Sequence, residues 1–383
     1  MITKSKIFII LLAVSCLLVY IPQKAKASVS VSAKSAILIE QDSGRIIYEK
    51  NANEKRRIAS ITKIMTAILA IESDKLKETV TVSEKAVRAE GSSIYLKPNE
   101  KIKLEDLVYG LMLRSGNDAA VAIAEYVGGS LDGFVYLMNQ KAEEIGMKNT
   151  NFANPHGLDD HENHYSTAKD MALLTRYAME NGTYRKISGT KVHRAPNPSE
   201  KWDRVWRNKN RLLTELYEYC TGGKTGYTKR AKRTLVTTAE KGDMKLIAVT
   251  LNDSNDWNDH ILMYETAFKQ YDMAEVLPEG TIKDITNPYY RGKTYIKHPV
   301  TYPITNQEED LFRIEYKMLK PKKIWKNGNR VPEIVGRATI YFNQQPISKL
   351  PIYYRYAEDK KETSLKEFFK NIFISMVGVN ENG

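Results

Sequence analysis

A serine and a lysine three residues apart, Ser60 and Lys63, could together carry out nucleophilic catalysis. Side chains at i and i+3 share one face of a helix with Cβ atoms about 5–6 Å apart, so the amine can reach the hydroxyl. A serine becomes a good nucleophile only when a base takes its proton. A lysine is such a base only when neutral, which requires burial or a nearby cation to lower its pKa. The pair therefore predicts covalent catalysis by Ser60 with Lys63 as the base.

Two further motifs supply groups that acyl transfer would need around such a nucleophile. Ser115 offers a hydroxyl that can relay a proton, and Asn117 offers an amide that can hold a substrate peptide. Lys224 and Thr225 place a charge and a donor hydroxyl on a predicted strand edge, which suits a carboxylate. Lys224 is also a cation that could lower the pKa of a nearby lysine. Each motif alone is common, but all three in this order form a specific signal.

The third motif also indicates how a substrate could lie. Gly226 removes side-chain bulk, so an extended peptide can add to the strand edge. The backbone N–H groups of Ser60, expected at a helix N-terminus, and of Tyr227 are suited to bind an oxyanion. Ile64 and Ile68 recur at helical spacing and would surround the lysine with apolar groups.

Hydrophobic spacing predicts the elements that would position these motifs. Helices are predicted at 60–69, 104–112, 119–127, 134–145, 166–178 and 259–271, with Ser60 and Ser166 as N-caps. Strands are predicted at 36–39, 45–48, 80–82, 234–239 and 245–251, and the last two should pair antiparallel about a turn at 241–243. A hairpin is expected within 191–211. This order predicts an α+β fold, with one antiparallel sheet and flanking helices.

The first 27 residues are predicted to be a signal peptide. A basic start precedes an apolar run at 7–21, and the small residues Ala25 and Ala27 stand before the expected cleavage site. The segment carries four lysines and no acidic residue, so its removal lowers the net charge from +12 to +8. It also removes one of the two cysteines and leaves Cys220, for which packing is a better expectation than reactivity.

The rest of the chain divides into three predicted parts. Residues 28–277 would form the catalytic domain, and 278–361, where short β-prone runs alternate with Pro, Gly and Asn, a smaller all-β C-terminal domain. Residues 362–383 carry Leu365, Phe368, Phe369, Ile372, Phe373, Met376 and Val377 at helical spacing. We expect this amphipathic helix to bind a membrane surface, although docking on its own domain is the alternative.

Charge and export together restrict the partners. The chain has 58 Lys and Arg against 46 Asp and Glu. A basic exported protein meets anionic lipid or anionic wall polymer, so nucleic acid and ATP are not expected as partners. The expected location is the extracytoplasmic face of the cell membrane, or of the forespore membrane in a spore former.

With these motifs in place, the sequence resembles the serine D-alanyl-D-alanine carboxypeptidases, the low-molecular-mass penicillin-binding proteins. The resemblance rests on Arg57-Ile58-Ala59-Ser60-Ile61-Thr62-Lys63-Ile64-Met65-Thr66, Leu113-Arg114-Ser115-Gly116-Asn117-Asp118-Ala119-Ala120, Asn154-Pro155-His156-Gly157-Leu158 and Gly222-Gly223-Lys224-Thr225-Gly226-Tyr227-Thr228. It covers essentially the whole mature chain and implies a serine β-lactamase/transpeptidase-like fold. The stretch 158–165 and the run around Trp257 are most similar to the spore-cortex member.

The resemblance implies a role for each matched residue. In the family's terms, Ser60 forms the acyl-enzyme, Lys63 is the base, Ser115 and Asn117 complete the proton path and hold the substrate amide, and Lys224 and Thr225 bind the terminal carboxylate. The family removes the last D-Ala from peptidoglycan stem pentapeptides and is acylated by penicillins and other β-lactam antibiotics, and neither cofactor nor metal is expected. Some relatives add an arginine shortly after the strand that follows the Lys-Thr-Gly strand, but the corresponding stretch here, 253–260, contains none.

The residues also bear on several alternative functions. A P-loop would need a glycine where Glu218 stands, and His161-Glu162-Asn163-His164 has one residue too few for a zinc peptidase H-E-x-x-H motif. A non-catalytic wall-binding protein would not need two lysines beside a serine, and a β-lactamase would need a deacylating glutamate that the sequence does not identify. A DD-endopeptidase or transpeptidase shares the acyl-enzyme and stays open.

Overall fold

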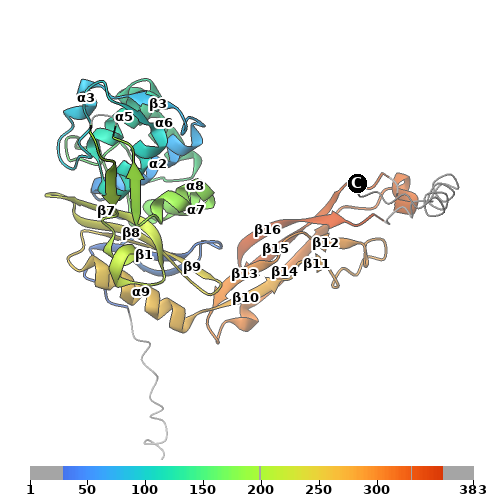
Figure 1. The fold of residues 1–383 in the computed structure, drawn as a ribbon. Helices are drawn as coiled ribbons and strands as arrows, with labels where there is room; N and C mark the ends of the chain where they lie inside the picture. Colours follow the sequence, from blue (N-terminus) through green and yellow to red (C-terminus); the bar gives the residue numbers. More distant parts are fainter. Residues whose placement is uncertain (1–28, 198–199, 329, 357–383) are drawn as a thin grey trace, which may run out of the picture. The chain divides into compact units, whose positions relative to one another are not determined.

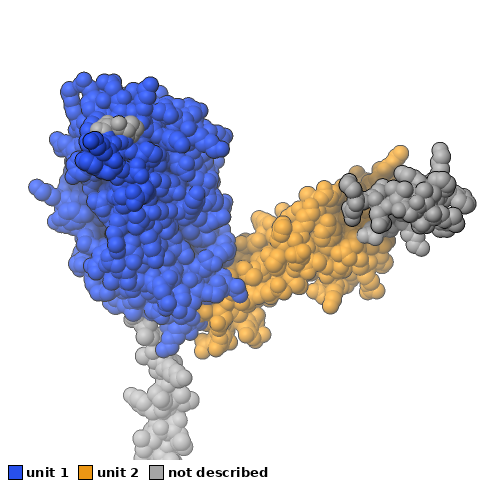
Figure 2. Space-filling view, viewed as in Figure 1, with its two compact units in different colours: residues 1–270 blue, residues 271–383 orange. Residues whose placement is uncertain are grey.

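The protein was analysed as a computed structural model, which describes residues 29–197, 200–328 and 330–356. The chain forms two compact units, residues 1–270 and 271–383 (Figure 2). The division falls earlier than the boundary expected at 277, because β10 (Asp272–Leu277) pairs with β13 (Val300–Ile304) of the second unit. The predicted signal peptide at 1–27 and the predicted amphipathic helix at 362–383 lie outside the described residues.

The first unit is built on a five-stranded antiparallel sheet, as predicted. Its strand order is β2-β1-β9-β8-β7 (Figure 1). The strands are β1 (Ser35–Glu40), β2 (Ile46–Lys50), β7 (Cys220–Thr228), β8 (Lys232–Lys241) and β9 (Met244–Leu251). The predicted pairing of β8 with β9 is confirmed, with Lys241 opposite Met244 at the turn. Strand β7, which carries the Lys-Thr-Gly motif, is an edge strand.

Helices cover the sheet because its side chains alternate between two apolar layers. Leu235 packs with Ile261 of α9 (Asp256–Gln270), whereas its neighbour Val236 joins the main core. That core includes α7 (Ala168–Glu180), which packs on β1 and β9. Packing on both faces therefore holds the sheet, and with it the edge strand β7, in place.

The helical part lies above the sheet in Figure 1. Its helices are α2 (Lys63–Glu72), α3 (Glu84–Val87), α4 (Leu104–Tyr109), α5 (Asn117–Gly128), α6 (Leu131–Glu144) and α8 (Gly182–Ser188). It also contains two short antiparallel strand pairs. In one, β3 (Thr79–Thr81) pairs with β4 (Lys101–Lys103), and in the other, β5 (Val192–Ala195) pairs with β6 (Arg204–Arg207). Residues 117–124 of α5 are all buried, as its apolar composition predicts. The β5–β6 pair confirms the hairpin expected within 191–211.

Two local predictions, both of N-caps, were wrong. Ser60 is not an N-cap, because residues Ala59–Thr62 form a 3₁₀ turn and α2 begins at Lys63. Helix α7 is capped by Thr167, whose side chain accepts from the Asp170 N–H, while Ser166 pairs with Arg56. Asn181 follows the last residue of α7, and its side chain accepts from the first N–H groups of α8.

The second unit is a β structure with its own core, as predicted for the C-terminal domain. A five-stranded sheet has the order β11-β12-β16-β15-β14, and β10 pairs separately with β13. The strands are β11 (Gly280–Thr281), β12 (Thr294–Ile296), β14 (Phe312–Met318), β15 (Ile334–Phe342) and β16 (Gln345–Tyr354). Tyr290, Val335 and Ile352 are central to the core. None of the helices in the described ranges combines the length and apolar composition needed to span a bilayer.

Candidate active site

Ser60 and Lys63 face each other at the start of α2. Ser60 lies in the 3₁₀ turn, and the Lys63 Nζ donates to the Ser60 Oγ over 3.0 Å. Lys63 is fully buried and donates two more hydrogen bonds, to the Asn117 Oδ1 at 2.7 Å and to the His156 carbonyl oxygen at 2.7 Å. These three hydrogen bonds hold the amine in place. When Lys63 is neutral, its two N–H groups can donate to Asn117 and His156, and the nitrogen lone pair is then directed at the Ser60 hydroxyl.

The environment of Lys63 favours that neutral form. Burial is the largest cause that lowers its pKa well below 10.5, and the charges of Lys224 and Lys209 lower it further. The Asp118 carboxylate acts in the opposite direction. Because the lowering effects win, Lys63 can act as a proton acceptor at a pH where an exposed lysine would be an ammonium ion.

Ser115 and Lys224 form a second hydrogen-bonded pair in the same site. The Lys224 Nζ donates to the Ser115 Oγ at 3.1 Å and to the Thr225 carbonyl oxygen at 2.8 Å. Burial, followed by the charge of Lys209, lowers the pKa of Lys224 to about 7. Ser115 has φ +65°, a left-handed conformation in the sharp connection between the π-helical turn Gly110–Arg114 and α5. Strain of this kind persists at functional sites where the surrounding structure holds it.

The edge strand β7 brings the third motif against the Ser60 turn. A Cβ atom added to Gly226 would lie 2.9 Å from the Ser60 backbone nitrogen and 3.1 Å from the Ile61 nitrogen. Only glycine permits this approach, so the Ser60 N–H and the start of the Tyr227 segment lie beside one another. An open cleft of about 320 Å³ results, lined by Ser60, Ser92, Ser115, Lys209, Thr225, Gly226, Tyr227, Arg233, Asp256 and Trp257. All eight sequence-predicted site residues thus belong to this cleft or to its buried wall.

His164 is a positioning residue that the motif analysis did not single out. The Ala153 N–H donates to its Nδ1 at 3.1 Å, so the proton sits on Nε2, which donates to the Thr62 Oγ1 at 2.8 Å. Thr62 donates in turn to the Ala59 carbonyl oxygen, which closes the Ser60 turn. Burial is the main cause that lowers the pKa of His164 to about 4. Both ring nitrogens are therefore occupied by hydrogen bonds within the protein.

Asp118 is the second residue whose role became visible only in the fold. Its buried carboxylate accepts from the Ser93 Oγ at 2.6 Å and from the Ile94 and Leu96 N–H groups at 3.0 and 3.2 Å. It thereby holds the loop that carries Ser92 into the cleft. The one sequence signal for Asp118 is its position directly after the Ser115-Gly116-Asn117 motif.

Gly157 allows the His156 segment to press against the Ser60 turn. It has φ +87°, and an added Cβ atom would lie 1.9 Å from the Ala59 carbonyl oxygen. Gly157→Ala is therefore expected to lower the free energy of unfolding by at least about 2 kcal/mol, because backbone strain and overpacking add. Denaturant unfolding measures the stability, and we expect peptidase activity to fall as well.

The matched control for that substitution is Gly146→Ala. Gly146 has φ +85°, but nothing lies within 4 Å of an added Cβ atom. The control therefore carries the strain without the collision, at a cost of about 1 kcal/mol. Equal losses of stability in both variants would show that the contact with Ala59 has no structural weight.

Two further residues of the first unit, Cys220 and Trp206, are structural. Cys220 is buried in a small apolar cluster with Leu213 and Leu235, and burial raises the pKa of its thiol to about 11. The prediction that it is a packed residue is confirmed. Trp206 is also buried and stacks near His193, whereas Trp202 is exposed.

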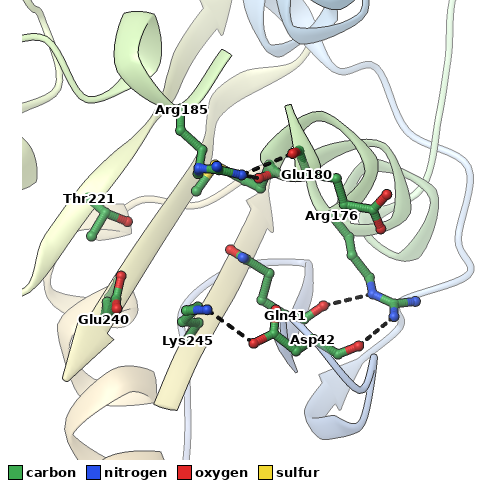
Figure 3. A pocket seen from close by; sticks show the side chains of 10 residues that line it. Gln41, Asp42, Arg176, Glu180, Arg185, Thr221, Glu240 and Lys245 are labelled. Carbon is green, nitrogen blue, oxygen red and sulfur yellow. Dashed lines mark hydrogen bonds and ion pairs between the residues drawn. The ribbon is translucent and has the colours of Figure 1, made fainter. Parts of the chain in front are cut away.

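A separate charged cleft shares no lining residue with the active-site cleft (Figure 3). Arg176 donates from Nε and Nη2 to the carbonyl oxygens of Gln41 and Asp42, each at 2.7 Å. Lys245 is paired with the Asp42 carboxylate at 3.2 Å, and Arg185 donates to the Glu180 carbonyl oxygen at 3.0 Å. The Arg176 bonds fasten the β1–β2 turn to α7, the Lys245 pair ties that turn to β9, and the Arg185 bond ties α8 to α7, so the cations of this cleft serve the fold.

Known proteins resemble this chain in sequence and in fold. Residues 22–255 match the family model of the D-alanyl-D-alanine carboxypeptidases, peptidase family S11. D-alanyl-D-alanine carboxypeptidase DacF of Bacillus subtilis strain 168 is 41% identical over 258 residues, which are 65% of this chain and 65% of the relative. DacC of Escherichia coli K12 is 39% identical over 242 residues, 59% of this chain and 58% of the relative. The chain thus spans slightly less than two thirds of the length of these relatives.

A solved structure extends the likeness into the second unit. The D-alanyl-D-alanine carboxypeptidase DacD from Francisella tularensis has a TM-score of 0.65 at 26% identity, covering 86% of this chain and 94% of that one. The predicted transpeptidase-like α+β fold is confirmed. Since the family model matches more than half of the residues, and the described part of that match holds the serine–lysine pair, the chain belongs to the S11 family of D-alanyl-D-alanine carboxypeptidases.

Proposed function

We propose that this protein is a serine DD-carboxypeptidase that removes the C-terminal D-alanine from peptidoglycan stem pentapeptides. The observation that carries the proposal is the buried Lys63 amine, 3.0 Å from the Ser60 hydroxyl and with a strongly lowered pKa. Family membership and the open cleft beside a strand edge support a peptide substrate.

Acylation follows from this geometry. Neutral Lys63 takes the Ser60 proton while the Ser60 Oγ attacks the carbonyl carbon of the penultimate D-alanine. The backbone N–H groups of Ser60 and Tyr227 would stabilise the oxyanion of the tetrahedral intermediate. Its collapse breaks the peptide bond, and the proton that Lys63 took from Ser60 passes by way of the Ser115 hydroxyl to the leaving amine, which makes Lys63 neutral again; Lys224 donates to the Ser115 Oγ at 3.1 Å.

Deacylation returns the site to its starting state. A water molecule gives a proton to Lys63 and attacks the acyl carbon, which frees the shortened peptide and restores the Ser60 hydroxyl. Asn117, whose Oδ1 accepts from Lys63 and whose Nδ2 donates to the Glu90 carbonyl oxygen at 2.5 Å, holds the amine and borders the substrate amide. Thr225, together with Lys224, would bind the terminal carboxylate.

The same acyl chemistry implies covalent labelling by β-lactam antibiotics, whose strained amide carbonyl would acylate Ser60. The family also acts on a polymer outside the cytoplasm, so we propose an extracytoplasmic location. Attachment to the membrane surface through residues 362–383 is part of this proposal, and so is a part in spore-cortex or cell-wall maturation, which the likeness to DacF supports.

The test is the product formed from a synthetic stem pentapeptide that ends in D-Ala-D-Ala. Mass spectrometry is expected to detect a tetrapeptide and free D-alanine in equal amounts, and no change in a peptide that ends in L-Ala-L-Ala. Cross-linked or transferred products in place of free tetrapeptide would contradict carboxypeptidase activity and favour the transpeptidase alternative. Complete absence of turnover would contradict catalysis.

A further inference from the structure

A cluster of charged side chains joins three segments of the first unit beside the active site. We call it the clasp, and it consists of Arg57, Asp159, Glu162 and Arg230. Arg57 stands three residues before Ser60 in the chain. Arg230 stands three residues after Tyr227, in the turn between β7 and β8. The clasp therefore lies next to both segments whose backbone N–H groups would bind the oxyanion.

Glu162 is the central residue of the clasp. Its Oε1 and Oε2 accept from the Arg230 Nη1 and Nη2 at 2.6 and 2.8 Å, which is the bidentate geometry of a strong arginine–carboxylate pair. The same Oε2 also accepts from the Arg57 Nη2 at 2.7 Å. One carboxylate thus bridges the segment that leads into Ser60 and the turn that follows Tyr227.

The loop that carries Glu162 makes further bonds to the same two segments. The Arg57 Nη1 donates to the His161 carbonyl oxygen at 2.9 Å and lies 3.7 Å from the Asp159 Oδ1. The Arg230 backbone N–H donates to the Asp159 Oδ2 at 3.4 Å. The side chains of Arg57 and Asp159 are 14% and 19% exposed, so this half of the clasp is partly shielded from water.

The exposed half of the clasp gains its strength from being part of a network. The side chains of Glu162 and Arg230 are 76% and 48% exposed, and a single ion pair at such a position contributes little. A bidentate pair within a group of several charges is the case in which an exposed pair does contribute. Hydrogen bonding from Arg230 is the largest cause that lowers the pKa of Glu162 to about 2, so its carboxylate is charged at neutral pH.

A second tie between the Ser60 segment and the β7–β8 hairpin lies deeper in the unit. Thr234 stands opposite Gly226 in the pairing of the two strands, and its Oγ1 donates to the Ile58 carbonyl oxygen at 2.9 Å. Tyr227 lies between this buried bond and the clasp. The hairpin is therefore attached to the Ser60 segment on both sides of the residue that would supply the second oxyanion donor.

We propose that Glu162 is a positioning residue for acyl transfer, which sets the spacing between the Ser60 and Tyr227 N–H groups by bridging Arg57 and Arg230. The inference rests on the proposed carboxypeptidase function and adds a residue to it. Donors fixed in advance at the oxyanion stabilise the transition state more than the bound substrate. The charges that act on the pKa of Lys63 are those of Lys224, Lys209 and Asp118, so loss of Glu162 should leave the base unaltered.

The test is the kinetics of Glu162→Gln on the stem pentapeptide that ends in D-Ala-D-Ala. We expect kcat to fall about tenfold, less than the loss of about 10²–10³-fold on removal of a whole oxyanion donor, and KM to stay within about twofold. The rate constant for acylation by a penicillin should fall by a similar factor. Labelling should still reach completion, which shows that the variant is folded, and the pH–rate profile should keep its position.

A double-mutant cycle separates the clasp from the individual charges. Arg230→Gln should reproduce the loss of kcat, and Glu162→Gln/Arg230→Gln should lose no more than either single variant, because all three break the same interaction. The matched control is Glu54→Gln, which removes an exposed acid paired with Arg56 at 2.6 Å, within the segment before Ser60. Its kcat and KM should equal those of the wild-type protein.

Three results would overturn the inference while D-alanine release by the wild-type protein still established the proposed function. They are a kcat within about twofold of the wild-type value in Glu162→Gln, losses that add in the double variant, and a displaced pH–rate profile. Failure of the wild-type protein to release D-alanine would instead overturn the proposed function, and this inference with it.

Discussion

The Ser60→Ala variant is expected to release D-alanine from the pentapeptide at least about 10⁴-fold more slowly than the wild-type protein, because it lacks the hydroxyl that Lys63 activates. It should also show no mass increase after incubation with a penicillin. The Ser60 side chain takes part in one hydrogen bond, from Lys63, and is not fully buried. Stability should therefore change by less than about 1 kcal/mol, which separates lost chemistry from lost folding.

Ser92→Ala is the matched control for that experiment. Ser92 lines the same cleft, and its hydroxyl only accepts a long contact from the Lys209 Nζ at 3.4 Å. Its removal should change the rate less than tenfold and leave penicillin labelling intact. Release of alanine by Ser60→Ala at a rate near that of the wild type would refute the mechanism.

Lys63→Gln is expected to have an effect of similar size, with kcat/KM lowered by at least about 10³-fold. The glutamine amide can donate a hydrogen bond but cannot accept the Ser60 proton. In the wild-type protein the rate should rise with pH as Lys63 loses its proton. That rise should be complete below the ordinary lysine pKa of 10.5, because burial is the main cause that lowers the pKa of Lys63.

A change at Lys209 tests the assignment of that pH dependence. The Lys209 charge lowers the pKa of Lys63, so Lys209→Gln should raise that pKa and move the rising part of the pH–rate profile to higher pH. In Lys63→Gln the residual rate should lack this rise. A profile that moves to lower pH in Lys209→Gln, or that keeps its rise in Lys63→Gln, would assign the base to another group.

The sequence determined the chemistry of this protein through local patterns. Ser60 and Lys63 at i and i+3 can meet on any helical turn, and the short turn at 241–243 between two β-prone runs is enough to place β8 and β9 beside each other. The Lys-Thr-Gly motif also falls on an edge strand, as predicted. These features depend on neighbours within a few residues, so composition and spacing are sufficient to predict them.

Long-range packing decided the rest, because it joins segments whose separation in the chain gives no signal. The 3₁₀ turn at Ser60 depends on His164, about a hundred residues away, and on the close approach of Gly157. The lowered pKa of Lys63 depends on burial by α5 and on cations from two other segments. The position of the Arg233 guanidinium likewise depends on the start of α9, because it donates to the Asp256 carboxylate and stacks on the Trp257 ring.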